Sequence, residues 1–161
     1  MPFHIHALEP AEFVPLFAMS DAELETKLAR RIVADAKPGY PCRVSLEDAE
    51  PGEAVILVHF MHHSANSPFR ASHAVYVREN AVRARIEPDE IPLQFHHRLM
   101  SVRAFDKVGM LRDAEVVEGR AMRPVIDRMF ADRETAELHL HFARPGCYAA
   151  RVTRMDEEHA V

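Results

Sequence analysis

The sequence predicts an α+β fold: a single domain over residues 1–161, built on a mostly antiparallel mixed β-sheet with two N-terminal helices and one late helix at about 120–131. Two observations support this class. Strand-like segments that are adjacent along the chain form hairpins at 99–117 and 137–153, and helical patterns are confined to the start of the chain and to the segment before the last hairpin. This arrangement is typical of α+β domains.

The first elements follow from periodicity and capping. Residues 3–7 alternate apolar and polar residues, which predicts a short strand, and Pro10 then opens a helical segment with apolar residues on one side. Ser20-Asp21-Ala22-Glu23 is a capping box, in which the Ser20 hydroxyl and the Glu23 carboxylate satisfy amides at a helix start. Leu24 and Leu28 extend this second helix at i and i+4.

Four more strands are expected between the second helix and residue 80. They are 31–34, 42–46, 54–60 and 74–78. The third is a continuous, β-branched apolar run, so it is expected to be a central strand covered on both faces. A long polar loop at 61–72 follows it, and residues 80–92 show no regular pattern.

The last elements include the late helix. Residues 99–105 and 111–117 resemble a hairpin around a turn at 107–109. Apolar residues with helical spacing follow, and Pro124 fits a helix only in its first turn, so the helix should start at about 120–123. Two final strands, 137–142 and 147–153, are joined by a turn.

Charge and composition limit the partners. The formal net charge is −5 and the basic residues are scattered, which argues against nucleic acid as a ligand. The sequence also shows neither an apolar run of membrane-spanning length nor the pattern of a signal peptide at its start. We therefore expect a cytoplasmic protein with no membrane partner. In that compartment Cys42 and Cys147 should be reduced thiols, although they could pair if their segments meet.

Two short segments have similar sequences, and each contains one of the two cysteines. Each segment sets a Pro-Gly turn beside a Cys, a Tyr and an Arg: the first is Pro38-Gly39-Tyr40-Pro41-Cys42-Arg43-Val44, and the second is Arg144-Pro145-Gly146-Cys147-Tyr148-Ala149-Ala150-Arg151-Val152. Proline fixes φ and glycine permits positive φ, so both segments should be tight turns that place polar side chains. They are the candidate ligand-binding segments, through Tyr40, Cys42, Arg43, Arg144 and Tyr148.

The same segments resemble those of a known family. The matching stretches are 38–46, 48–53, 67–68, 71–72, 77–79 and 143–148. They identify the chain as similar, over nearly its whole length, to the bacterial domain-of-unknown-function family numbered 1203. This resemblance implies no assigned activity, cofactor or catalytic residue. Two positions depart from the family pattern: Phe69 replaces a Tyr-like position, which puts a hydroxyl role there in doubt, and His73 replaces a small residue.

Histidine clusters form a second signal among the eleven histidines. His4 and His6 share one strand face, and so do His139 and His141, because side chains alternate along a strand. A third cluster contains His59, His62 and His63. Neighbouring strands could bring three or four imidazoles onto a Zn²⁺ ion. The alternative is a set of polar residues on a solvent-facing sheet surface, and because no fixed ligand motif is present, we assign no metal and no cofactor.

Three functional hypotheses remain open, and the sequence does not decide whether the protein is an enzyme. The leading one is a small-molecule-binding protein in which Arg43 and Arg144 bind an anionic ligand at a pocket that joins both turns. The second is a thiol-dependent enzyme that uses Cys147 with His139 or His141 as base. The third is a homodimeric interaction module without catalytic activity, in which both turns are structural corners. Each functional role has a structural alternative. The arginines could instead pair with carboxylates, and Cys147 could be a buried, unreactive residue.

Overall fold

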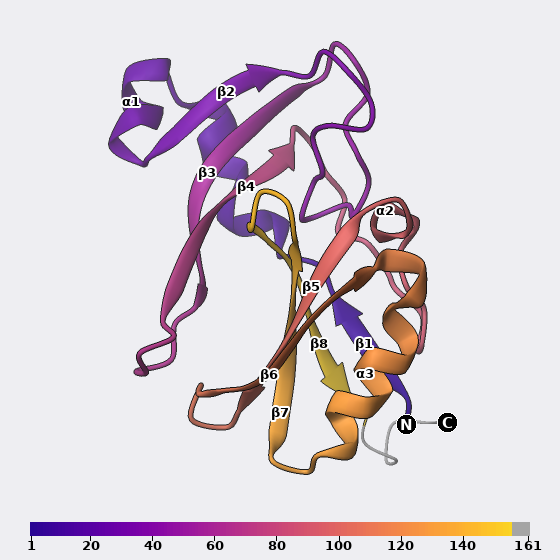
Figure 1. The fold of residues 1–161 in the computed structure, drawn as a ribbon. Helices are drawn as coiled ribbons and strands as arrows, with labels where there is room; N and C mark the ends of the chain where they lie inside the picture. Colours follow the sequence, from indigo (N-terminus) through magenta and orange to yellow (C-terminus); the bar gives the residue numbers. More distant parts are fainter. Residues whose placement is uncertain (156–161) are drawn as a thin grey trace. The chain divides into compact units, whose positions relative to one another are not determined.

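The computed structural model describes residues 1–155 and has an α+β fold, as the sequence predicts (Figure 1). Its strands are β1 (Phe3–His6), β2 (Ala29–Val33), β3 (Ala54–His63), β4 (Ala71–Arg78), β5 (Leu99–Asp106), β6 (Leu111–Glu118), β7 (Thr135–Phe142) and β8 (Tyr148–Arg154). The α-helices are α1 (Asp21–Thr26), α2 (Leu93–His96) and α3 (Met122–Ala131). Short 3-10 helices are η1 (Pro10–Glu12), η2 (Val14–Ala18) and η3 (Gly119–Ala121).

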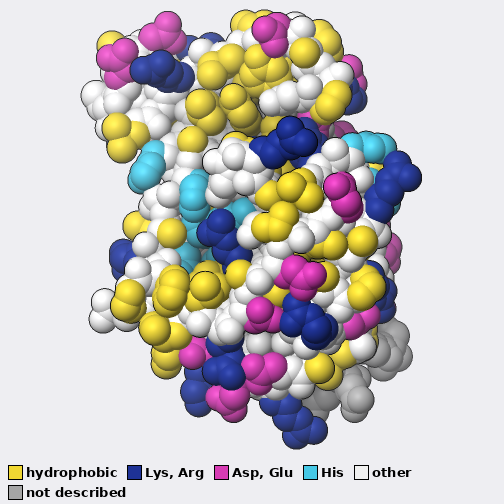
Figure 2. Space-filling model, in the orientation of Figure 1, with side chains coloured by type: hydrophobic (Ala, Val, Ile, Leu, Met, Phe, Trp, Pro, Cys, Tyr) yellow, Lys and Arg dark blue, Asp and Glu magenta, His cyan; other side chains and the backbone are white. Residues whose placement is uncertain are grey.

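The described chain divides into two compact units. Unit 1 contains residues 1–6 and 62–71 and the described residues from 86 onward, and unit 2 contains residues 7–61 and 72–85. The single domain expected from the sequence stays a prediction. Within the described residues no helix is long and apolar enough to cross a membrane. On the face shown in Figure 2, basic and acidic side chains are interspersed.

Unit 1 is built on a five-stranded sheet in the order β1-β8-β7-β5-β6, and every neighbouring pair is antiparallel. Helix α3 packs on one face of this sheet, against β5, β6 and β7 (Figure 1). The apolar residues of α3 that fill this core are Met122, Val125, Ile126, Met129 and Phe130. The sheet contributes Met100, Val102, Ala104, Leu138, Leu140, Val152 and Ile5, all fully or almost fully buried.

Most sequence expectations for unit 1 are confirmed. The helix starts at Met122, so Pro124 lies in its first turn, where its missing N–H costs no intrahelical hydrogen bond. The hairpin of β5 and β6 and the last strand pair also lie where they were expected. The short helix α2 was not expected, because Leu93 to His96 is a single turn that follows Pro92 without a side-chain cap.

Unit 2 contains a three-stranded sheet in the order β2-β3-β4, so β3 is central, as predicted. Val55 and Ile56 are consecutive and both fully buried, which confirms that both faces of β3 are covered at its start. His59 is exposed, so this cover does not extend along the whole strand. The strand continues to His63, and the loop predicted at 61–72 is therefore shorter, at 64–70.

Three local expectations in unit 2 were wrong. The segment after Pro10 forms two 3-10 turns rather than one helix, because Pro15 lacks the amide that a longer helix would need. The Ser20 cap forms and accepts a hydrogen bond from the Glu23 amide at 3.2 Å, but α1 ends before Leu28, which is exposed and has a φ of 52°. Residues 42–46 form a turn with isolated bridges instead of a strand.

Unit 2 contains an ion pair whose strength depends on pH. Arg78 donates two hydrogen bonds to the Glu53 carboxylate, at 2.6 and 2.7 Å, and this pairing lowers the pKa of Glu53 below its ordinary value of 4.5. A carboxyl whose pKa is depressed by folding contributes stability above its unfolded-state pKa and loses it as the pH falls through the folded-state pKa. We therefore expect Glu53→Gln to reduce the loss of thermal stability between neutral pH and about pH 3.

Thermal unfolding followed by circular dichroism across this pH range measures the effect. Glu79→Gln is the matched control, because Glu79 is an exposed glutamate beside the same arginine in sequence. Parallel stability–pH curves for Glu53→Gln and the unsubstituted protein would contradict the interpretation.

Candidate metal centre

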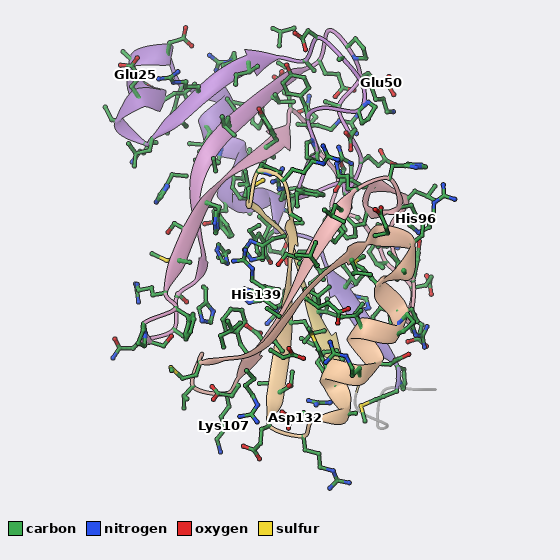
Figure 3. The ribbon with its side chains drawn as sticks, viewed as in Figure 1. Glu25, Glu50, His96, Lys107, Asp132 and His139 are labelled. Atoms are coloured by element: carbon green, nitrogen blue, oxygen red, sulfur yellow. The ribbon has the colours of Figure 1, made fainter. Side chains whose placement is uncertain are left out.

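The sheet of unit 1 has a second face, opposite α3, that carries histidines. Strand β7 alternates Leu138 and Leu140 toward the core with His139 and His141 toward this second face. His139 is 1% exposed and His141 is 0% exposed, so the solvent-facing surface considered from the sequence is wrong for these two residues. Figure 3 shows His139 along the sheet, whereas Lys107 and Asp132 lie at turns at the ends of strands. Both imidazoles are therefore buried polar groups that need partners.

Cross-strand register identifies the neighbours of these histidines. His139 lies opposite Arg103 of β5 on one side and Arg151 of β8 on the other. His141 lies opposite Ser101 of β5 and Tyr148 of β8. Directly opposed residues in an antiparallel pair point to the same face, so this face is polar at its centre.

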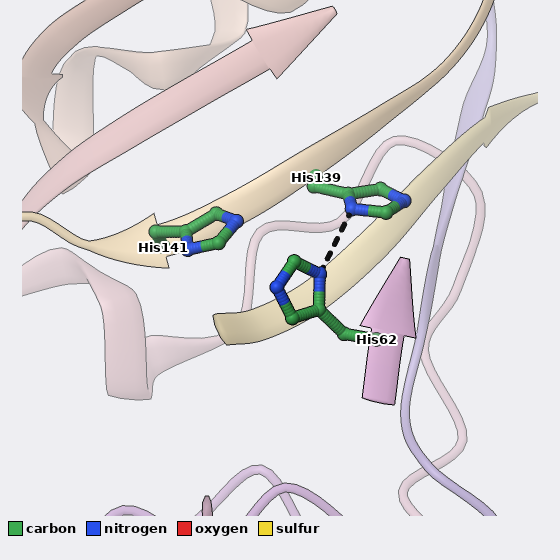
Figure 4. A group of neighbouring side chains, drawn as sticks. All are labelled: His62, His139 and His141. Carbon is green, nitrogen blue, oxygen red and sulfur yellow. Dashed lines mark hydrogen bonds between the residues drawn. The ribbon is translucent and has the colours of Figure 1, made fainter. Parts of the chain in front are cut away.

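His62, at the end of β3, supplies a third imidazole. Its ring stacks on that of Tyr148, with centroids 4.8 Å apart and an interplanar angle of 13°. The ring centroids of His139 and His141 lie 5.4 and 5.0 Å from that of His62, in edge-on orientations. Figure 4 shows the three rings gathered, two from β7 and one from β3. Tyr148 thus positions the histidine that comes from a distant part of the chain.

Hydrogen bonds fix which nitrogen of each β7 histidine carries a proton. Nε2 of His139 lies 2.9 Å from Oε1 of Glu137, and a carboxylate only accepts, so this nitrogen donates. Nδ1 of His141 lies 3.0 Å from the carbonyl oxygen of Gly146 and donates to it for the same reason. In the neutral imidazoles the lone pairs are then on Nδ1 of His139 and Nε2 of His141.

Glu137 orients the central histidine. The hydrogen bond from His139 lowers the pKa of the Glu137 carboxyl below its usual value, and the charge of Arg151 adds to this effect against the cost of burial. Arg151 donates to the same carboxylate at 3.4 Å. Carboxylate–histidine pairs of this kind are the usual outer support of metal-binding imidazoles, because they fix the tautomer and increase the basicity of the ligand nitrogen.

The spacing of the three imidazoles fits a tetrahedral metal ion. A tetrahedral Zn²⁺ with Zn–N distances of about 2.0–2.1 Å holds its ligand nitrogens about 3.3–3.4 Å apart. The Nδ1 atoms of His62 and His139 are 3.3 Å apart. One ligand atom from each of His62, His139 and His141 lies within 4.8 Å of the others. If the longest of these nitrogen–nitrogen distances shortens by about 1–1.5 Å, the three imidazoles have the geometry of a three-histidine site.

A second group of possible ligands shares His139. It consists of His63, Glu137 and His139. Nε2 of His63 is 3.0 Å from the carbonyl oxygen of Gly109, which also accepts a hydrogen bond from the Ser67 hydroxyl at 2.8 Å. A metal ion in this group would break the hydrogen bond between Glu137 and His139. We therefore take the group of three histidines as the candidate centre.

The backbone at Gly109 explains how the His63 side chain is held beside His139, with ring centroids 5.1 Å apart, by its hydrogen bond to this turn. Gly109 has a φ of 84°, a conformation that side chains disfavour, and a Cβ there would lie 2.3 Å from Cβ of Ala65. The turn of the β5–β6 hairpin therefore packs directly on the loop at 64–70 and offers its carbonyl oxygen to that loop.

The residues of the second Pro-Gly turn lie in unit 1, near these histidines. Arg144 is exposed in the turn between β7 and β8, and Cys147 is half-buried just before β8. Tyr148 is buried and its ring stacks on that of His62, and its role in ligand binding stays a prediction. Hydrogen bonds join His139 to Glu137 and His62, and His141 to the Gly146 carbonyl group. The thiol-dependent enzyme of the second hypothesis stays a prediction.

The residues of the first Pro-Gly turn lie in unit 2. The Tyr40 hydroxyl donates to Asp35, and Arg43 is buried and donates to the carbonyl oxygen of Pro41. Cys42 is fully buried, and its Sγ accepts hydrogen bonds from backbone amides of Ser45 and Arg78. Neither Cys42 nor Cys147 forms a disulfide bond. A ligand pocket that joins the two turns stays a proposal.

Three residues of the site were not selected from the sequence. His62 was noted only as part of a cluster, and neither Glu137 nor Arg103 was connected with the histidines. The signal for Glu137 was present, because Glu137, His139 and His141 alternate with the period of a strand and must share a face. Arg103 is found only from the register of β5 and β7.

Comparison with protein families places most of the chain within a family model. The model of a family described as "Protein of unknown function (DUF1203)" matches residues 39–154. No curated protein and no solved structure matches the chain.

The burial of the two thiols predicts different reactivity. Cys147 is half-buried and Cys42 is fully buried, so iodoacetamide should label Cys147 first in the folded protein. Mass spectrometry of tryptic peptides, with single Cys→Ser variants as controls, measures both rates. Faster labelling of Cys42 would contradict the packing described for the turn at 42–46.

Proposed function

Because this chain belongs to the DUF1203 family, for which the comparison supplies no activity, we propose its function from the histidine cluster: it binds a divalent transition metal ion, such as Zn²⁺, through His62, His139 and His141, and a small anionic molecule at the remaining coordination position. The observation that carries this proposal is the convergence of the three imidazoles, two of them buried. Imidazole nitrogen is a preferred ligand of Zn²⁺, and three protein ligands leave one position open.

The pattern of protonation supports the same proposal. His139 and His141 donate through one nitrogen to Glu137 and to Gly146, so in the neutral state each has the other nitrogen as a lone-pair ligand. His62 donates from Nδ1 to Nδ1 of His139 in the neutral cluster. Metal binding replaces this hydrogen bond if the proton of His62 moves to its Nε2, a tautomer change that costs no buried charge.

The open position decides what such a centre does. A Zn²⁺ ion with three histidine ligands holds a water molecule whose pKa is near 7, and an anionic ligand displaces this water. The proposal therefore retains the small anionic ligand expected from the sequence. The metal ion replaces Arg43 and Arg144 as the group that first binds this ligand. Cytoplasmic location and homodimer formation stay predictions.

Metal binding is testable with a variant and a control in the same strand. His62→Ala should weaken Zn²⁺ affinity by about 100-fold or more, because two ligands cannot hold the ion as three do. His59→Ala is the matched control, since His59 is an exposed histidine of β3 outside the group of three. Affinity is measured by competition with a chromogenic chelator, on protein purified without a histidine tag. Equal affinities of the two variants would refute the assigned ligands.

The support from Glu137 gives a separate prediction. Glu137→Gln keeps the size of the side chain but removes the charge that fixes His139, and loss of such outer partners typically weakens metal affinity by about 10–100-fold. Glu134→Gln, an exposed residue before the same strand, should leave the affinity unchanged. The same chelator competition measures both variants. An unchanged affinity in Glu137→Gln would show that this carboxylate does not support the ligand.

A further inference from the structure

Arg103 lies beside the candidate metal centre. It is on β5, directly opposite His139 of β7, so both side chains point to the same face of the sheet. The Cβ atoms of directly opposed residues are about 4.5–5.5 Å apart. The long guanidinium side chain of Arg103 therefore reaches the surroundings of His139, and it is half-buried there.

The hydrogen bonding of this guanidinium is incomplete. Nε of Arg103 donates to the Ser101 hydroxyl at 3.2 Å. Within residues 1–155, its terminal nitrogens Nη1 and Nη2 make no hydrogen bond and the side chain makes no ion pair. A guanidinium has five N–H donors. Each donor that is removed from water without gaining a hydrogen-bond partner costs free energy. Arg103 is thus a partly desolvated cation with four donors left to satisfy.

Three other arginines of unit 1 have partners for their terminal nitrogens; Arg123 and Arg154 are partly buried and Arg151 is exposed. Arg123 pairs with Asp127 and Asp89, and Arg154 donates to three backbone carbonyl groups. Arg151, on the opposite side of His139, pairs with Glu137. The difference at Arg103 is therefore specific to its position in β5 and is not a general property of arginines in this sheet.

A planar guanidinium with free terminal donors matches a carboxylate or phosphate group, which it binds through two parallel hydrogen bonds. A metal ion with an open position binds an oxygen atom of the same kind of group. Two cationic groups on adjacent strands therefore recognise two acidic groups of one small molecule. Ser101 fixes Nε, so the terminal fork is already oriented.

We propose that Arg103 binds the second acidic group of a ligand whose first acidic group occupies the open position of the metal ion, so that the ligand is a small dicarboxylic acid or a related compound with two acidic groups. This inference rests on the proposed function, because the first group needs the metal ion. Arg103 contacts the ligand directly, and Ser101 acts through Arg103 as a positioning residue.

The test uses the full-length protein loaded with Co²⁺, whose visible spectrum reports both the metal ligands and the displacement of water. Malonate, succinate and glutarate are titrated against the monocarboxylates with the same number of carbon atoms, namely propionate, butyrate and pentanoate. The best dicarboxylate should bind about tenfold or more tightly than its partner, as expected for a charge-assisted hydrogen-bonded pair. Arg103→Met should remove this preference, and the paired arginine variant Arg112→Met should keep it.

The measurements separate the two proposals. The Co²⁺ affinity of Arg103→Met should stay within about twofold of the unsubstituted protein, which also shows that the variant folds. No Co²⁺ binding to the unsubstituted protein would overturn the proposed function and this inference with it. Co²⁺ binding without a dicarboxylate preference, or with a preference that survives in Arg103→Met, would overturn the role of Arg103 alone.

Discussion

The burial of two imidazoles side by side on β7 is the constraint on which unit 1 depends. His139 and His141 lie in the middle of a five-stranded sheet, where water does not reach them, so their nitrogens need protein partners. Glu137, Gly146 and His62 supply these partners from the same strand, from the following turn and from the end of β3. Each partner fixes a ring orientation, and one nitrogen of each of the three imidazoles lies within 4.8 Å of the others.

The rest of the sheet supports this arrangement. The other side chains of β7 fill the core under α3, so the strand cannot shift without exposing Leu138 and Leu140. Tyr148 is placed opposite His141 because the pairing of β7 and β8 contains an irregularity after Leu140, with Ala149 as the extra residue. The tyrosine ring in turn stacks on His62. A local feature of one strand pair thus holds a side chain that arrives from elsewhere in the chain.

Much of the fold of unit 1 could be predicted from the sequence, because α3 and the last four strands have clear periodicity and well-placed turns. The turn at 42–46 was mistaken for a strand because its apolar residues are buried through tertiary contacts and not through a ladder. The candidate site was predicted only in part. The alternation of side chains along the strand predicts that His139 and His141 share one face. The burial of that face and the position of His62 beside it depend on sheet order and register, which no local sequence pattern encodes.

The alternation of β7 also has an evolutionary consequence. One strand carries core residues on one side and candidate ligands on the other, so insertion or deletion of a single residue within it would exchange the two sets. Leucines would then face the imidazole partners, and histidines would face α3. Changes in chain length are therefore expected to accumulate in the turns at either end of β7. The strand itself should be inherited as a block of fixed length, even where its individual residues vary.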